Sequence, residues 1–165
     1  MPSRVKTAAT QAADSPAAPR GCTNLKLRQL SRRVTRHYDQ YVAATGLKNT
    51  QYSLLSHAVL LGPIRPGELA ARMQLEPSTL TRNLQPLIAQ GWLALEPGED
   101  ARSRLVVATE SGRAKRVEAQ RAWKQAQLAL NHQLGDARVV RLHALIDECL
   151  ALMDEAPGQD GETHV

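Results

Sequence analysis

The chain has 165 residues, of which 42% are hydrophobic and 22% charged, and its formal net charge is +5. These values are typical of a soluble globular protein with one ordinary domain and argue against disorder throughout. No apolar run approaches the roughly 18 residues that a membrane span needs, so we expect no membrane partner. The two cysteines, Cys22 and Cys149, are too few for a disulfide framework, so we expect reduced thiols and a cytoplasmic location.

The first 21 residues are predicted to form a disordered basic tail, because Pro2, Pro16 and Pro19 interrupt any helix there. An amphipathic helix follows from Thr23, its expected N-cap, to Ala44, and it ends at Gly46. Its expected apolar stripe consists of Leu27, Leu30, Val34, Tyr38 and Tyr41. The opposite face of this helix is basic.

The next three segments are also predicted to be helical. The first runs from about Asn49 to Gly62, with Leu54, Leu55, Ala58, Val59 and Leu61 buried. A short helix over 68–73 and a turn over 74–76 then lead to a helix that begins at Pro77 and closes on Gly91. A short helix, a tight turn and a second helix indicate a helix-turn-helix motif.

After Gly91 the hydrophobic period changes from that of a helix to that of a strand. The stretches "WLALE" (92–96) and "RLVVAT" (104–109) flank a loop rich in Pro, Gly and Asp, which predicts a β-hairpin. A hairpin directly after the second helix is a wing. Its arginines, Arg102 and Arg104, would approach a DNA groove, while Asp100 would orient one of them through a charge-assisted bond. An ordinary solvated hairpin tip is the alternative.

Two more helices are expected, over about 111–134 and from Asp136 onward, before an acidic tail over 154–165. The last helix has an apolar stripe from Val139 to Met153 that nothing in the middle of the chain can cover. We therefore expect a two-fold homodimer. The expected organisation is a dimerisation region over 22–47 and 113–153 around a DNA-binding domain over 48–112.

The helix from Pro77 opens with hydroxyl, amide and guanidinium groups, which hydrogen-bond base edges and phosphates in a major groove. The candidate DNA contacts on it are Ser78, Thr79, Thr81, Arg82 and Asn83. A cap at Ser78 with solvated neighbours is the alternative. Pro86 lies inside this helix and is expected to bend it beyond the base-reading turn.

From about Gly21 to Met153 the sequence resembles the MarR family of winged helix-turn-helix repressors. The wing "DARSR" (100–104) is similar to the family's D-x-R-S-R signature, and Thr109 and Gly112 match the Thr-x-x-Gly that follows it. The segments "GELAARMQLEPSTLTR" and "STLTRNLQPLIAQGWL" look like the family's helix, turn and recognition helix. The resemblance implies a mainly α fold with a small β-wing and a homodimer interlocked through its N- and C-terminal helices. It also implies a recognition helix from Pro77 in the major groove and Arg102 in the minor groove of double-stranded DNA.

The resemblance further implies a small aromatic acid or phenol as an effector, bound between the dimerisation helices and the winged domain. The local candidates are Arg32, Tyr38, Tyr41 and His57, since a carboxylate favours a cation and a ring favours an aromatic wall. Plain packing of these side chains is the alternative.

The sequence leaves three other functions open. Cys22 lies near the place where some relatives sense oxidants, which leaves a redox-sensing repressor as an alternative. An effector-independent DNA-binding regulator and a dimeric module whose basic face binds acidic protein are the others. The two cysteines are too few for a zinc cluster, and the histidines are scattered without a catalytic motif, so neither a metal, another cofactor nor an enzyme is expected.

Overall fold

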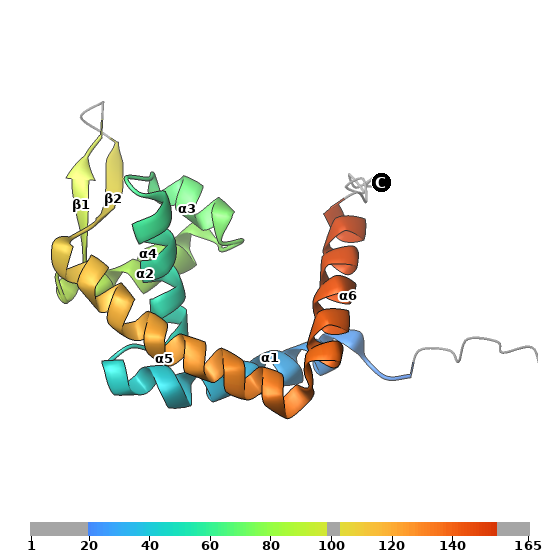
Figure 1. Cartoon of the computed structure of the whole chain (residues 1–165). Helices are drawn as coiled ribbons and strands as arrows, with labels where there is room; N and C mark the ends of the chain where they lie inside the picture. Colours follow the sequence, from blue (N-terminus) through green and yellow to red (C-terminus); the bar gives the residue numbers. More distant parts are fainter. Residues whose placement is uncertain (1–19, 99–102, 155–165) are drawn as a thin grey trace, which may run out of the picture.

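The structure, a computed structural model, describes residues 20–98 and 103–154. Its elements form a mainly helical fold with one small hairpin, which confirms the expected fold class (Figure 1). In chain order they are α1 (Thr23–Val42), the 3-10 turn η1 (Ala43–Thr45), α2 (Asn49–Leu61), α3 (Pro66–Arg72), α4 (Pro77–Ala89), β1 (Leu93–Pro97), β2 (Arg104–Ala108), α5 (Glu110–Leu134) and α6 (Asp136–Asp154).

The core lies between α2, α3, α4 and the hairpin. Its fully buried side chains include Leu54, Leu55, Leu69, Leu80, Leu87, Leu93 and Val106. Burial of this aliphatic set supplies the main driving force for folding the winged unit. The expected burial of Leu61 is wrong, because it is the last residue of α2 and is 39% exposed. Tyr52, which the apolar pattern did not include, is buried instead.

The two strands pair antiparallel, with Leu93 opposite Ala108 and Pro97 opposite Arg104. A third segment joins them where the sequence indicated only a helix break. Ile64 exchanges backbone hydrogen bonds with Val106, with N···O distances of 3.2 and 2.8 Å. The link between α2 and α3 therefore pairs with the base of the wing and fixes its direction.

Small residues form the contact face of α5. Its buried residues are Gly112, Ala119 and Ala126, spaced seven apart on one face. Small side chains allow neighbouring backbones to approach closely, and α1 runs beside α5 (Figure 1). His37 donates from Nε2 to the Ala126 carbonyl at 2.8 Å, and Tyr38 stacks on Trp123 with ring centroids 6.0 Å apart.

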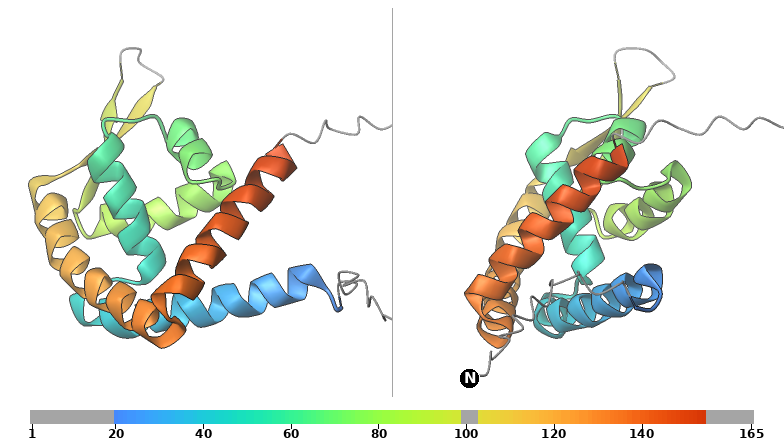
Figure 2. Two further views of the ribbon diagram at one scale, coloured as in Figure 1. Left: turned by 45° about the vertical axis from the view of Figure 1, so that its right-hand side comes forward. Right: turned by 90° about the vertical axis from the view of Figure 1, so that its right-hand side faces the viewer.

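The terminal helices expose far more apolar surface than helices that pack fully against the rest of a protein. In α6 only Val139 is buried, and in α1 the expected stripe residues Leu27 and Leu30 are exposed. Both helices leave the rest of the molecule near the end of α5 and diverge from one another (Figure 2). The N-terminal cap also differs from expectation, since Thr23 is the first helical residue and Cys22 occupies the N-cap position without a side-chain bond.

Thr109 and Gly112 hold the start of α5 against the turn between α4 and β1. The Thr109 hydroxyl accepts the Gly112 N–H at 3.0 Å and donates to the Gly91 carbonyl at 2.7 Å. Ser111 donates to the same carbonyl at 3.0 Å. A Cβ at Gly112 would lie 1.9 Å from the Trp92 carbonyl oxygen, so only glycine allows this approach.

Replacing Gly112 with Ala should lower the free energy of unfolding by about 1–3 kcal/mol, because the overlap outweighs the higher helix propensity of alanine. Gly67→Ala is the matched control, since Gly67 is also helical but has no atom within 4 Å of an added Cβ. Urea unfolding of both variants measures the difference. Equal stability of the two variants would contradict this account of the Thr109–Gly112 contact.

Candidate nucleic-acid interface

The helix-turn-helix consists of α3, a tight turn and α4. Both helices begin with a proline, Pro66 and Pro77, whose fixed φ suits the first helical position. In the turn, Gln74 has a φ of 50°, and the Leu75 N–H donates to the Ala70 carbonyl at 2.9 Å. This backbone conformation and this hydrogen bond fix the angle between the two helices.

The first turns of α4 separate buried leucines from exposed polar groups. Leu80 and Leu84 face the core, Ser78, Thr81 and Arg82 are exposed, and Thr79 and Asn83 are half-buried. Thr81 donates its hydroxyl to the Pro77 carbonyl at 2.9 Å, which leaves its oxygen free to accept a further bond. Among the described residues Arg82 has neither an ion-pair partner nor a hydrogen bond from its side chain.

Pro86 lies inside α4, where its missing N–H removes one helical hydrogen bond. The helix nevertheless continues to Ala89, and the proline is exposed. The bond that it removes would have reached the carbonyl of Arg82, one turn earlier, and the side chains of the candidate contact residues still project from helical backbone.

The wing extends away from α5, and the link between α2 and α3 lies beside its base (Figure 1). Arg104 begins β2 and is exposed opposite Pro97, at the outer end of the strand pair. The Gly98 N–H donates to the Ser103 carbonyl at 3.0 Å. Asp100 and Arg102 lie outside the described residues.

The four expected effector residues are not brought together. Arg32 is exposed on α1 and lines a shallow hollow with Leu27 and Arg28. Tyr38 is buried and donates its hydroxyl to Gln127 Oε1, and this burial raises the pKa of the Tyr38 phenol above its usual value. Tyr41 contacts the His37 ring.

Only His57 of the four lines the cavity between α2 and α5. The cavity has a volume of about 360 Å³. Its lining includes Tyr52, Ser56, His57, Arg116, Gln120 and Trp123. His57 donates from Nδ1 to the Ser53 carbonyl at 2.8 Å, because a carbonyl can only accept. Arg116 and Trp123 come from α5, and sequence reasoning missed both as site residues.

Two polar atoms of this lining are buried without a partner. Neither Arg116 Nε nor Ser56 Oγ has a hydrogen bond within the described part of the chain. A buried donor without a partner costs about 1–3 kcal/mol. The lining of the cavity therefore combines polar groups that lack a hydrogen-bond partner with an aromatic wall.

The remaining candidates stay isolated. Cys22 and Cys149 are exposed and unpaired. Over residues 20–98 and 103–154 there is no group of three or more His, Cys, Asp or Glu side chains that could hold a metal ion. None of the helices described is long and apolar enough to span a membrane.

Comparison with known proteins identifies related regulators. The sequence profile of the MarR family matches residues 45–103. An HTH-type transcriptional regulator of Mycobacterium tuberculosis is 35% identical over 114 residues, which span 66% of this chain and 76% of the relative. An uncharacterized HTH-type transcriptional regulator of Bacillus subtilis is 29% identical over 90 residues, 54% of this chain and 66% of the relative.

Solved structures agree with these matches. The M. tuberculosis transcriptional regulator MosR, crystallised in complex with DNA, is 31% identical with a TM-score of 0.68, over 81% of this chain and 98% of MosR. A variant of MarR from E. coli complexed with operator DNA has a TM-score of 0.72 at 22% identity, over 77% of this chain and 92% of that one, and so shows a shared fold. Because the match to MosR covers almost its whole length and extends across the helices, the turn and the wing described above, this chain belongs to the MarR family of winged helix-turn-helix transcriptional regulators.

Proposed function

We propose that the protein is a homodimeric DNA-binding repressor that a small aromatic carboxylate or phenol releases from a pseudo-palindromic operator. The observation that carries this proposal is the exposed polar face of α4, where Arg82 is unpaired among the described residues, together with the exposed Arg104 at the outer end of the wing. The related regulators crystallised with DNA support the same reading.

The chemistry of α4 suits the major groove. An arginine presents a planar fork to guanine, and Asn83 presents an amide to adenine, while Ser78 and Thr79 stand at the N-terminal turn where free N–H groups favour a phosphate. The wing would add backbone or minor-groove contacts through Arg102 and Arg104, with Asp100 orienting one of them. In this proposal α4 would read the bases, and the wing would position the protein on the DNA.

Arg82→Ala should relax the preference for one base pair in each half-site, at a cost of about 1–3 kcal/mol, whereas Arg102→Ala should weaken binding to every sequence and reduce the salt slope by about one. Binding titrations on in vitro selected and random duplexes, each at several salt concentrations, separate the two effects. Equal loss on random and selected duplexes for Arg82→Ala would contradict base reading by α4. An unchanged salt slope for Arg102→Ala would count against the wing.

Homodimerisation through the terminal helices follows from exposed apolar surface and from charge. On α6, Val140, Leu145 and Met153 are more than half exposed, as are Leu25 and Leu27 on α1. Large apolar side chains exposed along two helices indicate an interaction site. Residues 20–38 contain six Lys and Arg and no Asp or Glu, whereas residues 142–165 contain six Asp and Glu and no Lys or Arg. The α1 helix of one copy therefore complements the α6 helix of another.

A charge exchange tests this pairing. The double variant Arg28→Glu/Arg32→Glu and the double variant Asp147→Lys/Glu148→Lys should each dimerise about tenfold more weakly than the parent, because every reversed contact costs up to about 1 kcal/mol. Mixing the two variants should give a heterodimer in preference to either homodimer, as native mass spectrometry would detect. Arg121→Glu on α5 is the control for added negative charge. A random mixture of dimers would refute the pairing of α1 with α6.

The cavity between α2 and α5 is the proposed effector site. Arg116 can pair with a carboxylate or phenolate, Ser56 can donate to it, and Trp123 and Tyr52 provide the aromatic wall. Of the residues proposed from sequence, His57 remains in this role, and Arg116 replaces Arg32 as the cation. Because the cavity lies between a helix of the winged unit and α5, an occupant would act on the angle between them.

Salicylate or benzoate should raise the melting temperature, by an amount that corresponds to about 2.7 kcal/mol at a concentration of one hundred times the dissociation constant. Arg116→Gln should weaken that binding at least tenfold, since a charge-assisted bond is worth about 1.5–3 kcal/mol. Arg121→Gln is the control, because Arg121 is an exposed arginine of the same helix. A thermal shift that Arg116→Gln leaves unchanged would rule out this cavity as the site.

A further inference from the structure

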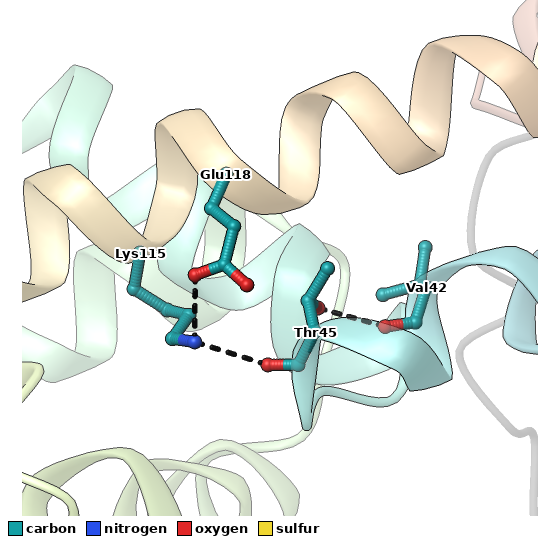
Figure 3. Close-up of polar contacts among 4 residues, drawn as sticks. All are labelled: Val42, Thr45, Lys115 and Glu118. Carbon is teal, nitrogen blue, oxygen red and sulfur yellow. Dashed lines mark hydrogen bonds and ion pairs between the residues drawn. The ribbon is translucent and has the colours of Figure 1, made fainter.

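The Lys115 side chain lies where three segments of the chain meet. Its ammonium donates to the Thr45 backbone carbonyl at 3.1 Å and to Glu118 Oε2 at 2.8 Å (Figure 3). It also lies 5.3 Å from the centroid of the Trp92 ring, within the range of a cation–π contact. The side chain is only 21% exposed, so these contacts are partly shielded from water.

Two of the three contacts lead to other parts of the molecule, since Glu118 lies on α5 with Lys115. Thr45 ends η1, directly after α1, and its own hydroxyl is held by the Val42 carbonyl at 2.7 Å (Figure 3). Trp92 stands between the end of α4 and the start of β1. Lys115 itself belongs to the second turn of α5. One ammonium group thus connects the expected dimerisation helices with the segment that joins the recognition helix to the wing.

The partner on the winged side is itself fixed. The Thr109 N–H donates to the Trp92 carbonyl at 3.2 Å, and Gly112 packs against the same carbonyl. These contacts lie within the winged unit and the start of α5, so they hold the wing against α5 and do not involve α1. The contact from Lys115 to Thr45 is different, because it extends the same framework to the end of α1.

We infer that Lys115 is a positioning residue that fixes the angle between the recognition helix and the dimerisation helices, and so the separation of the two recognition helices in the dimer. This inference rests on the proposed DNA-binding function. In a two-fold dimer any rotation at this junction occurs in both subunits, so its effect on the spacing between the two recognition helices is doubled. Half-sites on DNA have a fixed spacing of about one helical turn or a multiple of it. Lys115 therefore governs spacing discrimination without contacting DNA.

The test uses the full-length chain and duplexes that it selects in vitro from a random library, with the spacing between half-sites then changed by one and two base pairs. Lys115→Met keeps the aliphatic stem and removes the ammonium. We expect it to bind the selected spacing about tenfold more weakly and the altered spacings almost as well as the parent does, which flattens the spacing profile. Lys115→Arg keeps the cation and should restore most of the discrimination.

Two further variants separate positioning from general stability. Glu118→Gln removes the ion pair but leaves the contacts with Thr45 and Trp92, so its spacing profile should match that of the parent. Trp92→Leu removes the ring from the other side of the junction and should flatten the profile as Lys115→Met does, even where Lys115→Met folds poorly.

A uniform loss of affinity at every spacing for Lys115→Met or Trp92→Leu, with the profile otherwise unchanged, would overturn the inference and leave the proposed function intact. Failure of the parent chain to select any duplex would overturn the proposed function and this inference together.

Discussion

The close approach of α5 to the segment between α4 and β1 is the contact on which the rest of the structure depends. Gly112 lies against the Trp92 carbonyl, and the Thr109 hydroxyl joins the first turn of α5 to the Gly91 carbonyl. Ala119 and Ala126 continue the same face toward α1. Because α5 connects the winged unit with the terminal helices, its position on this narrow face determines where the wing and α4 stand relative to any partner subunit.

Much of the winged unit could be predicted from the sequence, since its signals are local. Pro77 marks a helix start, Gly91 marks a helix end, and the alternation after Gly91 marks strands, whereas the short helix predicted over 68–73 begins two residues earlier, at Pro66. The contacts that fix their arrangement were not predicted, because they depend on tertiary approach. Ile64 gave no strand signal, yet it pairs with Val106. The alanine face of α5 was missed because a search for large apolar residues ignores small ones.

The two candidate sites also differ in how far the sequence alone predicts them. The polar face of α4 follows from helical periodicity alone, since Leu80 and Leu84 place Ser78 and Arg82 on the other side. The cavity does not follow from one element, because its cation and its indole come from α5 while His57 comes from α2. Arg32 was predicted as the cation for a carboxylate, on the same helix as Tyr38. The structure shows that the N-terminal half of α1 is exposed, whereas Tyr38 lies at the buried end.

The length of α5 explains how separate features can influence one another. Its 25 residues span about 38 Å as a single rigid element. The first turn holds the wing, Lys115 contacts the end of α1, and Arg116 faces the cavity on the α2 side. Farther along, Ala126 accepts a bond from α1, and α6 follows after Gly135. Adjacent residues of one turn thus face the cavity and the junction, so a ligand that moves Arg116 must act on the helix that also carries Lys115. In the proposed function, a rigid helix with these contacts would convert a change in the cavity into a change of angle between the winged unit and the terminal helices, which is the physical requirement for coupling an effector to DNA binding.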